Sequence, residues 1–372
     1  MLKIAIIGCG NIADSHASQI QRIEGSEIVA ACDKETLMAK QLCDRFSIKE
    51  YFSDVDVMLR EAKPDVVHIT TPPQSHHLLA KRCLEHGCHV YLEKPFTVHA
   101  WEAVELVEIA ERNGVMLTPG HDAQFSPASI RLRELVKGGY LGGSPVHLEC
   151  TWCYSLADPA YAKAFLGNDQ HWVRRLPGGL LQNIISHGIG LIGEYFDYQD
   201  PTVIAHGFVS PTLNELGEKQ IIDELRVILS NGKDLTAYFT FSSQMQPAVH
   251  TFEIYGAKNG LTLDEGRQMV LKLGGKKYKS FAERFVPPAN LVKQGIGNIL
   301  HSTWLFLTNQ FHMEASKKNL MEAFHRSIVD GSAPPISPRE ILFTVRVMES
   351  IFEQVCTKPS EQADPTPNPD LP

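Results

Sequence analysis

Short apolar runs alternate with segments of helical periodicity along the first third of the chain. The apolar runs predict strands at residues 2–7, 27–32, 66–70, 89–93 and 115–118. The amphipathic segments between them predict helices at residues 11–22, 36–46, 76–87 and 98–113. Strict alternation of this kind is typical of parallel strands joined by helical crossovers. The pattern therefore indicates an α/β fold with a doubly wound parallel sheet over residues 1–120.

Beyond residue 120 the rhythm changes to longer strands that follow one another directly. We expect strands at residues 145–155, 202–209, 221–229, 235–242, 251–255, 261–263 and 269–273, and helices at 312–329 and 338–355. Turn sequences at 230–234 and 257–260 join neighbouring strands, which favours antiparallel pairing. Residues 121–357 are therefore predicted to form an α+β domain for substrate binding and oligomerisation, built on a large, mostly antiparallel open sheet.

Two segments of the second half fit this pattern less well. Residues 282–311 contain an apolar run from Trp304 to Leu307, which suits either an interface helix or simple core, and the choice stays open. The tail, residues 358–372, holds five prolines and few apolar residues, so we expect it to be disordered.

The composition is that of an ordinary globular protein, with 43% hydrophobic and 21% charged residues among 372. A net charge of -8 offers no basic surface for nucleic acid or for an anionic membrane. No apolar run approaches the roughly 18 residues needed to span a bilayer, and the first residues lack the architecture of a signal peptide. We therefore expect a soluble, cytoplasmic protein with neither of these partners.

The eight cysteines are too sparse for a disulfide framework in a chain of this length. Cys150 and Cys153 form a lone CxxC inside a strand-like run, where residues three apart point to opposite faces. We therefore expect mostly buried thiols and no metal site.

The strongest local signal follows the first strand, where the chain reads Gly8-Cys9-Gly10-Asn11-Ile12-Ala13. In such a GxGxxA turn, Gly8 permits the tight turn, Gly10 lets the backbone approach a pyrophosphate, and Ala13 allows close packing of the helix. Asp33 ends the next strand, where a carboxylate can accept hydrogen bonds from the adenosine ribose. The pattern predicts a Rossmann dinucleotide-binding domain whose cofactor contacts include Gly8, Gly10, Asn11, Ile12, Ala13, Asp33 and Lys34.

A second glycine-rich stretch, residues 188–193, also matches GxGxxG. Only a few residues separate it from the break at Asp200-Pro201, which leaves no room for a strand, helix and strand unit. We interpret these glycines, and Gly295 with Gly297, as packing positions in or beside helices.

Two further segments follow the carboxyl ends of predicted strands, where ligands bind in parallel sheets. They read Thr70-Thr71-Pro72-Pro73-Gln74-Ser75-His76 and Glu93-Lys94-Pro95. We expect the cofactor cleft to be bordered by Thr71, Pro72, His76, Glu93 and Lys94. The GxGxxA turn precedes these segments, and Gly178-Gly179 and His187 follow them. With these motifs in this order, nearly the whole chain resembles the Gfo/Idh/MocA oxidoreductases.

The resemblance implies roles for particular residues. Lys94 matches the family lysine that contacts the nicotinamide ribose and the substrate and assists proton transfer at the reacting hydroxyl. A cation there would stabilise the developing alkoxide. His187 matches the family histidine, but the family acid four residues earlier is Asn183 here, and another family acid three residues later is Gly190. A spacing of four puts Asn183 and His187 on one helical face, and proton transfer falls to the two catalytic candidates, Lys94 and His187.

Further substrate contacts are expected between residues 151 and 178. Trp172 and Arg174 resemble a W-x-R element that precedes the glycine pair in relatives, so both join Lys94, Asn183 and His187 as substrate-binding candidates. The rings of Trp152, Tyr154 and Tyr161 offer faces that suit a sugar ring. Weaker candidates lie where the second domain begins, namely His121, Asp122 and Gln124.

The chain is thus predicted to be an NAD(P)-dependent oxidoreductase that moves a hydride between nicotinamide and a carbinol carbon of a sugar, cyclitol or sugar derivative. Asp33 favours NAD because its charge repels a 2′-phosphate, while Lys34 leaves NADP possible. Two alternatives stay open: transient oxidation that drives elimination, epimerisation or glycoside cleavage, and a sensor that binds NAD without turnover. Relatives associate through the open sheet, so we expect a homodimer or homotetramer.

Overall fold

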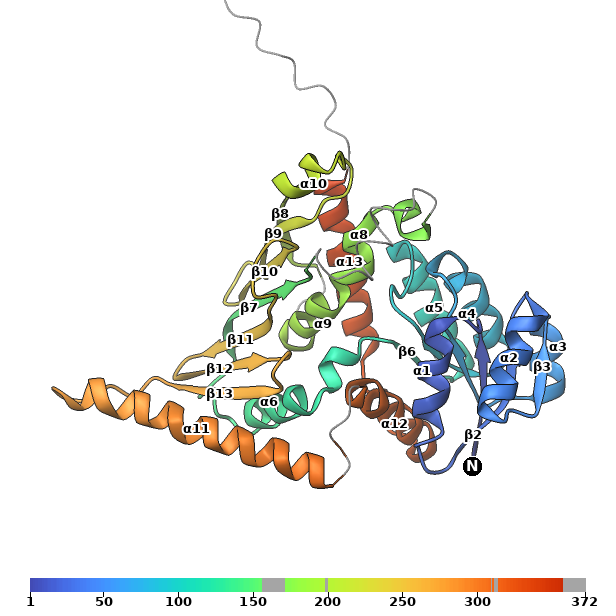
Figure 1. Cartoon of the computed structure of the whole chain (residues 1–372), viewed down its shortest axis with the longest axis horizontal. Coiled ribbons are helices and arrows are strands. Elements are labelled where there is room, and N and C mark those ends of the chain that lie inside the picture. The colour runs from blue at the N-terminus through green and yellow to red at the C-terminus, as the bar shows by residue number, and fades with distance from the viewer. Residues whose placement is uncertain (156–170, 198–199, 309, 311–313, 357–372) are drawn as a thin grey trace, which may run out of the picture.

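The computed structural model describes residues 1–155, 171–197, 200–308, 310 and 314–356, and Figure 1 shows its two sheets side by side. Within these residues the first sheet has six parallel strands in the order β3-β2-β1-β4-β5-β6. The strands are β1 Leu2–Ile7, β2 Ser26–Cys32, β3 Glu50–Phe52, β4 Val66–Ile69, β5 His89–Leu92 and β6 Leu117–Pro119. The helices that connect them are α1 Asn11–Ile20, α2 Thr36–Phe46, α3 Val55–Ala62, α4 His76–Glu85 and α5 Ala100–Asn113. The expected doubly wound sheet is confirmed.

Local sequence determines where several of these helices begin and end. The Asp54 carboxylate caps α3 by accepting a hydrogen bond from the backbone N–H of Val57 at 2.9 Å. Glu102 completes a capping box at the start of α5, and Gly114 ends that helix in the left-handed conformation with a φ of 66°. These caps fix where α3 begins and where α5 begins and ends.

The second sheet has seven strands in the described part of the chain, in the order β13-β12-β11-β7-β10-β9-β8. They are β7 Pro145–Cys153, β8 Thr202–Phe208, β9 Glu224–Ser230, β10 Thr236–Ser242, β11 His250–Gly256, β12 Asn259–Asp264 and β13 Met269–Gly274. All neighbours pair antiparallel except β7 and β10, which run parallel. The accompanying helices are α6 Pro127–Lys137, α8 Gly179–Ile184, α9 Ser186–Tyr195, α10 Pro211–Glu215, α11 Ala282–Leu307 and α13 Pro338–Val355. The expected mostly antiparallel sheet is confirmed.

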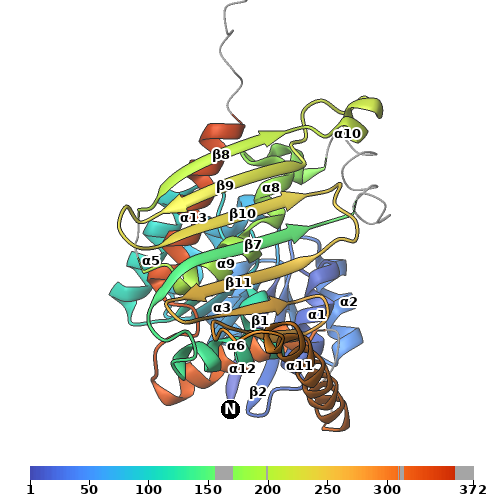
Figure 2. The ribbon, with the colours of Figure 1, turned by 90° about the vertical axis from the view of Figure 1, so that its left-hand side faces the viewer.

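One face of the second sheet carries helices and the other is open, as Figure 2 shows from the open side. Along β10, Phe239 and Phe241 are fully buried beneath the helices, whereas Tyr238 on the opposite face is 48% exposed. Alternation of this kind is what an antiparallel sheet with one solvated face requires. The open sheet predicted from the sequence is therefore present.

The glycines of residues 188–193 are packing positions, as expected. A Cβ atom on Gly188 would lie 2.5 Å from the ring of Phe239, and one on Gly193 would lie 2.8 Å from the ring of Phe343. Helix α9 can therefore approach the sheet at Gly188, and α13 at Gly193, only because these positions lack side chains. Gly295 and Gly297 are different, since they lie in α11 and face open space, so the interpretation as packing positions is wrong for them.

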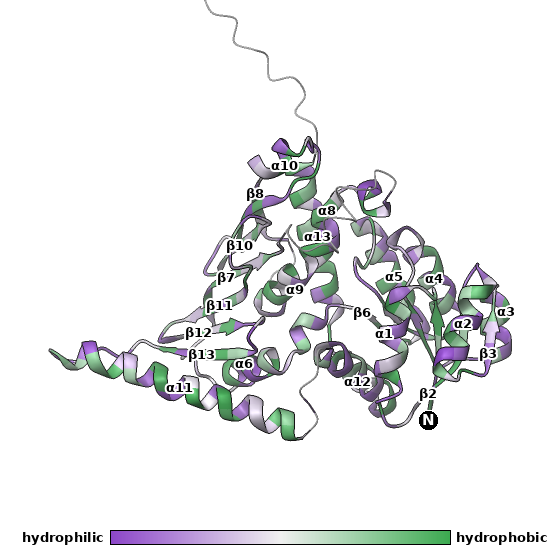
Figure 3. Cartoon of the chain, in the orientation of Figure 1, coloured by the Kyte–Doolittle hydropathy of each residue, from purple (hydrophilic) through white to green (hydrophobic). Residues whose placement is uncertain are grey.

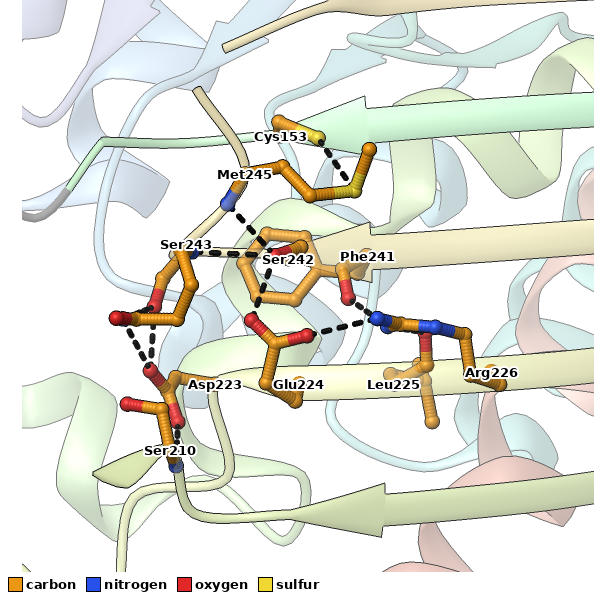
Figure 4. Close-up of polar contacts among 11 residues, drawn as sticks. Cys153, Ser210, Asp223, Glu224, Leu225, Arg226, Phe241, Ser242, Ser243 and Met245 are labelled. Carbon is orange, nitrogen blue, oxygen red and sulfur yellow. Dashed lines mark hydrogen bonds and ion pairs between the residues drawn. The ribbon is translucent and has the colours of Figure 1, made fainter. Parts of the chain in front are cut away.

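A cluster of polar side chains fixes one end of the second sheet (Figure 4). The buried Asp223 carboxylate accepts a hydrogen bond from the hydroxyl of Ser243, and buried Glu224 accepts one from Ser242 Oγ at 2.6 Å. These bonds offset the cost of burying two carboxylates. The carbonyl of Ser242 in turn accepts a hydrogen bond from the backbone N–H of Tyr154 at 3.1 Å, which anchors the end of β7.

Helix α12, Ala315–Asp330, returns from the second half of the chain to the first sheet (Figure 1). Leu320, Met321 and Phe324 are fully buried in the same apolar cluster as Ile4 and Ile6 of β1. The core of the first sheet is therefore completed by residues far away in the sequence. The division of the chain into domains at residue 120 stays a prediction.

Helix α11 runs alongside β13, where Asn298 Nδ2 donates to the carbonyl oxygen of Val270, and one end of the helix projects beyond the sheet in Figure 1. Figure 3 shows hydrophobic residues along its length. Phe285, Leu300 and Leu307 are largely exposed on it. The segment from 282 to 307 is consequently not simple core.

Several elements carry no sequence signal that we recognised. Strand β3 has only three residues, and α3, α6 and α10 are short or lie outside any regular alternation. Among the described helices none is long and apolar enough to cross a bilayer. The tail, residues 358–372, lies outside the described residues.

Candidate functional site

A cleft of about 600 Å³ opens at the carboxyl ends of β1, β2 and β4. Gly8 turns the chain with a φ of 91°, and a Cβ atom there would lie only 2.6 Å from Cγ2 of Thr71. Gly10 also lines the cleft, and nothing lies within 4 Å of the position of its Cβ atom. The bare backbone at the start of α1 thus faces an open space in which an anion can approach its N–H groups.

Asp33 lines the same cleft beside the glycine turn, and two backbone N–H groups hold its carboxylate in place. Its Oδ2 accepts a hydrogen bond from the backbone N–H of Cys9 at 2.7 Å, and its Oδ1 accepts one from the backbone N–H of Glu35 at 2.9 Å. The remaining lone pairs are available to the hydroxyls of a ribose. Lys34 lines the cleft as well and is exposed. These residues fit a dinucleotide.

The other expected cofactor contacts divide into two groups. Thr71 and Pro72 line the cleft, and Asn11 and Ile12 are exposed in the first turn of α1. Ala13 is fully buried, which fits its expected packing role.

His76 is buried away from the cleft and joins two turns. Its Nε2 lies 2.8 Å from the carbonyl oxygen of Thr71, and its Nδ1 lies 3.0 Å from that of Pro95. Burial lowers its pKa. His76 therefore holds the turns that carry Thr71 and Lys94 in a fixed relation, and the geometry gives it a positioning role instead of direct contact with a cofactor.

Glu93 and Lys94 leave the end of β5 in opposite directions. Glu93 is buried, and its Oε1 lies 2.7 Å from Nε2 of His16 on α1. Lys94 is half-buried, and its Nζ donates to the carbonyl oxygen of Asn183 at 3.2 Å and to its side-chain oxygen at 3.4 Å. Lys94 thus connects the first sheet to the α8 region, whereas Glu93 faces the interior of the Rossmann fold.

The electrostatic setting of Lys94 and His187 favours their uncharged forms. Burial lowers the pKa of Lys94, against the opposing charges of Glu93 and Asp122. Burial and the neighbouring Lys94 hold the pKa of His187 well below its usual range. Nδ1 of His187 lies 3.5 Å from Oδ1 of Asp122 and has no hydrogen-bond partner in the described part of the chain. These shifts favour the neutral amine of Lys94 and the neutral imidazole of His187, each of which has a nitrogen lone pair that can accept a hydrogen bond.

Asp122 supplies a carboxylate close to the place where the family acid is missing. Burial raises the pKa of its carboxyl to about 6, although nearby Lys317 and Lys94 act in the other direction. At position 190, where relatives carry another acid, a side chain would point towards His121 Nδ1, 3.5 Å from the Cβ position. Asp122 thus stands beside His187 as a titratable group that neither Asn183 nor Gly190 can provide.

Asn183 and His187 do not share one continuous helix. A turn at Ile185 separates α8, which carries Asn183, from α9, which carries His187. The spacing of four is therefore a wrong guide to how these side chains meet. They are brought together by Lys94, which contacts Asn183 directly and whose charge acts on His187.

A second cavity, of about 710 Å³, adjoins Asp122 and His187. Trp152 stacks between two histidine rings, with centroid distances of 4.4 Å to His250 and 5.7 Å to His187. Its Nε1 is buried and has no hydrogen-bond partner among the described residues. Glu265 faces the same cavity, and burial raises its pKa to about 7. An aromatic wall with unpaired polar atoms suits a ligand that is rich in hydroxyls.

Tyr154 also lines this cavity, whereas Arg174 and Trp172 do not. Arg174 lines a different cavity of about 550 Å³ and donates to Glu218 at 2.8 Å. The carbonyl of Trp172 accepts a hydrogen bond from Gln74, at the edge of the cofactor cleft. Tyr161 lies outside the described residues.

Lys317 of α12 is the site residue that sequence reasoning missed most completely. It is almost fully buried, and its Nζ donates to Ser15 Oγ on α1 at 2.8 Å. Its positive charge lowers the pKa values of Glu93 and Asp122. The signal was weak, because a lysine at the start of a helix more than 220 residues after Glu93 resembles any solvated surface lysine.

Comparison with known proteins agrees with a Rossmann fold in the first part of the chain. Residues 2–121 match the model of an oxidoreductase family with an NAD-binding Rossmann fold. The chain is 35% identical over 142 residues to D-glucoside 3-dehydrogenase from Escherichia coli K12, over 38% of this chain and 40% of that protein. It therefore spans less than half the length of this relative.

Two further similarities extend over more of the chain. It is 21% identical over 295 residues to myo-inositol 2-dehydrogenase from Thermotoga maritima, over 76% of this chain and 84% of that protein. The crystal structure of an NAD-binding oxidoreductase from Klebsiella pneumoniae superimposes with a TM-score of 0.77 at 18% identity, over 95% of this chain and 96% of that one. The last similarity shows a shared fold over both sheets.

Proposed function

Because the chain is related to the Gfo/Idh/MocA oxidoreductases through its NAD-binding Rossmann domain, we propose that it transfers a hydride between nicotinamide and a carbinol carbon of a sugar, cyclitol or sugar derivative. The observation that carries this proposal is that His187 and Asp122 meet in the lining of the 710 Å³ cavity, while Lys94, which contacts Asn183, is close enough for its charge to act on His187. Relatives named as dehydrogenases of a glucoside and of myo-inositol support the substrate class.

Bound NAD supplies the hydride acceptor or donor, and the protein must manage the proton. Lys94 accepts the proton of the substrate hydroxyl during oxidation and returns it to the carbonyl oxygen during reduction. Its lowered pKa makes the neutral amine accessible, and its ammonium form stabilises the alkoxide. His187 holds the same oxygen or its neighbour by a hydrogen bond, with Asp122 oriented towards Nδ1. Asn183 fixes Lys94 through two oxygen atoms.

Asp33 favours NAD over NADP in this proposal. Its carboxylate is held by two backbone N–H groups, so it cannot move aside for a 2′-phosphate, whose charge it would repel. Lys34 lies next to it and reduces this preference without removing it.

The substrate would rest against Trp152 with its hydroxyls towards Asp122, His187 and Glu265. Two carboxyls with raised pKa values can each donate or accept a hydrogen bond near neutral pH, which suits hydroxyl groups. The same pair disfavours an anionic substrate above pH 7, when both are ionised.

We also propose a homo-oligomer, dimeric or tetrameric, formed through the open face of the second sheet. Ile204, Phe208, Ile228 and Tyr238 are exposed on the strands of that sheet, and α11 adds a long apolar surface. Contiguous exposed apolar surface of this kind marks protein interfaces. The cytoplasmic location stays a prediction from the sequence.

The deciding experiment combines binding with turnover. Purified protein is titrated with NADH and NADPH by fluorescence and then tested with a panel of sugars, cyclitols and nucleotide sugars for formation of NADH. We expect binding that favours NADH, and oxidation of at least one sugar. Binding without turnover of any substrate would support the sensor alternative, and conversion of a sugar without net NADH would support transient oxidation. Absence of binding to either cofactor would overturn the proposal.

A further inference from the structure

A continuous row of three buried histidines joins Glu93 to Ser26. Oε1 of Glu93 lies 2.7 Å from Nε2 of His16, and Nδ1 of His16 lies 3.0 Å from Nδ1 of His68. Nε2 of His68 lies 3.3 Å from Nε2 of His325, whose Nδ1 lies 2.9 Å from Oγ of Ser26. Each imidazole uses both of its nitrogens, so the row has no gap.

The row crosses the Rossmann fold from the carboxyl ends of the strands to their amino ends. Glu93 follows the carboxyl end of β5, while Ser26 is the first residue of β2, at the amino ends of the strands. His16 and His68 are fully buried, His325 is nearly so, and Ser26 is half-buried. The three histidines come from α1, β4 and α12, which are separate elements. The row therefore connects the reacting end of the cleft to the opposite side of the domain.

Aromatic packing holds these rings in fixed orientations. The ring of His68 stacks on Tyr91 with a centroid distance of 4.7 Å and an interplanar angle of 3°. His16 meets both His68 and Tyr91 edge to face, and His325 meets His68 in the same way. Such packing keeps the nitrogen atoms at hydrogen-bond distance without help from solvent.

The charges at the end of the row determine where every proton lies. Burial would raise the pKa of Glu93, but the hydrogen bond from His16 and the charges of Lys317 and Lys94 hold it well below its usual range. Burial lowers the pKa values of His16 and His68, so both are neutral. An ionised carboxylate can only accept, so Nε2 of His16 donates and its Nδ1 accepts.

The same reasoning assigns the ring protons of the other two histidines. Since Nδ1 of His16 accepts, Nδ1 of His68 must donate, and its Nε2 must accept from Nε2 of His325. Burial lowers the pKa of His325 to about 4, so its Nδ1 carries no proton and accepts from the hydroxyl of Ser26. All donors in the row consequently point towards Glu93.

We propose that Ser26, His325, His68 and His16 form a proton relay between solvent and Glu93, the chain neighbour of Lys94 in the proposed oxidoreductase, on which this inference rests. For inward passage, Ser26 gives its hydroxyl proton to Nδ1 of His325 and regains one from water. His325 gives its Nε2 proton to Nε2 of His68, His68 gives its Nδ1 proton to Nδ1 of His16, and His16 gives its Nε2 proton to Glu93. One proton has entered, Glu93 is protonated, and all three tautomers are reversed.

Charge couples Glu93 to Lys94 on the reacting side. Oε2 of Glu93 accepts a hydrogen bond from the backbone N–H of Lys94 at 3.0 Å, and the charge of Glu93 opposes the lowering of the Lys94 pKa by burial. A proton that reaches Glu93 removes this charge and favours the neutral amine of Lys94, and its return along the reversed tautomers to Ser26 favours the ammonium again. Each passage reverses the tautomers, so an inward and an outward passage in succession restore the starting state.

Charged groups near the row sit at its two ends. Lys317 and Glu314 act on His16, and Glu322 acts on His325. His68, in the middle, is influenced chiefly by burial and by the other two histidines. His68 is therefore the link whose replacement interrupts the relay with the least change in charge around it.

The first test requires no substrate. Protein labelled with ¹⁵N-histidine is transferred to D₂O, and exchange of the His16 ring N–H is followed by NMR. We expect the wild-type protein to show a proton on Nε2 of His16, Nδ1 of His68 and Nε2 of His325, and to exchange the His16 proton at least about 10-fold faster than His68→Asn or His325→Asn. A different tautomer pattern, or exchange that neither substitution slows, would overturn the relay.

The second test measures catalysis. His68→Asn and His325→Asn are expected to lower kcat at least about 10-fold and to change its solvent isotope effect, with the Kd for NADH unchanged. His89→Asn, at the start of β5 and outside the row, is the matched control and should retain wild-type values. If His68→Asn does not fold, His325→Asn decides. Wild-type kcat in folded variants would overturn the relay, whereas absence of turnover in the wild-type protein would count against the proposed function alone.

Discussion

Replacement of Gly10 by alanine should weaken cofactor binding without destabilising the protein. The backbone of Gly10 has φ −79° and ψ −168°, which alanine adopts freely, and no atom lies within 4 Å of the new Cβ position. The added methyl group would occupy the space through which a pyrophosphate reaches the N–H groups of α1. Loss of one charge-assisted hydrogen bond costs roughly 1.5 to 3 kcal/mol, which corresponds to about a 10- to 150-fold increase in Kd.

Two other glycines provide matched controls for this change. Gly8→Ala combines a φ of 91° with a contact of 2.6 Å to Thr71, so it should lower stability as well as binding. Gly25→Ala has a φ of 81° and open space around it, so it should lose only the roughly 1 to 2 kcal/mol of an unfavourable backbone conformation. The three variants separate backbone strain, steric contact and obstruction of the cleft.

Two measurements on each variant test this reasoning. Thermal unfolding of the cofactor-free protein should show Gly10→Ala within error of wild type, with Gly25→Ala lower by several degrees and Gly8→Ala lower still. Fluorescence titration with NADH should show weak binding for Gly10→Ala and Gly8→Ala and normal binding for Gly25→Ala. If Gly10→Ala binds NADH as tightly as wild type, the cofactor does not lie on this turn and the interpretation of the cleft is wrong.

Three further substitutions test other parts of the site and surface. Lys94→Met should lower kcat about 100-fold or more while the Kd for NADH stays within a few fold, as measured by steady-state kinetics and titration, and an unchanged kcat would remove Lys94 from the chemistry. Asp122→Asn should flatten the pH dependence of stability. The pKa of this carboxyl rises from 3.8 to about 6 on folding, so the folded protein binds the proton more tightly than the unfolded chain. The free energy of unfolding of the wild-type protein therefore decreases as pH rises through this window. Urea unfolding between pH 4 and 7 measures this free energy. Glu265→Gln should remove the part of the decrease that extends up to about pH 7. A pH profile of stability that neither substitution alters would contradict the burial argument. The double substitution Ile296→Glu and Leu300→Glu on α11 should reduce the mass measured by light scattering. Val329→Glu on α12, at a similarly exposed position, should leave this mass unchanged. A wild-type protein that is already monomeric would refute the proposed interface.

The elements that the sequence predicts best are those whose signal is local. Residues 2–7 and 36–46 match β1 and α2 because an apolar run, or an amphipathic period with a clear end, needs no knowledge of the rest of the chain. Strand β3 has only three residues, Glu50–Phe52, and its pairing with β2 depends on the neighbouring strand more than on its own pattern. Short elements held by tertiary contacts therefore escaped prediction.

The candidate site shows the same division. The glycine turn, Asp33 and Lys94 follow strand ends in a recognisable order, so sequence alone located them. Lys317 and His325 belong to α12 and reach the site only because that helix folds back onto α1 and the first sheet. Arg174 is a substrate-binding candidate in the sequence, but Glu218, 44 residues later, pairs with it. Contacts between residues distant in sequence therefore determine where Lys317 and His325 lie and what Arg174 binds.

The return of α12 to the first sheet has a consequence for synthesis of the protein. Leu320, Met321 and Phe324 complete the apolar core that β1 begins, yet they are translated about 200 residues after the sheet itself. At roughly 5 to 20 residues per second, the nascent first sheet waits about 10 to 40 s for them. During that interval its α1 side exposes the apolar surface that α12 later covers, and it also lacks His325. A ribosome-bound chaperone, or early binding of NAD at the glycine turn, would act on this unfinished intermediate.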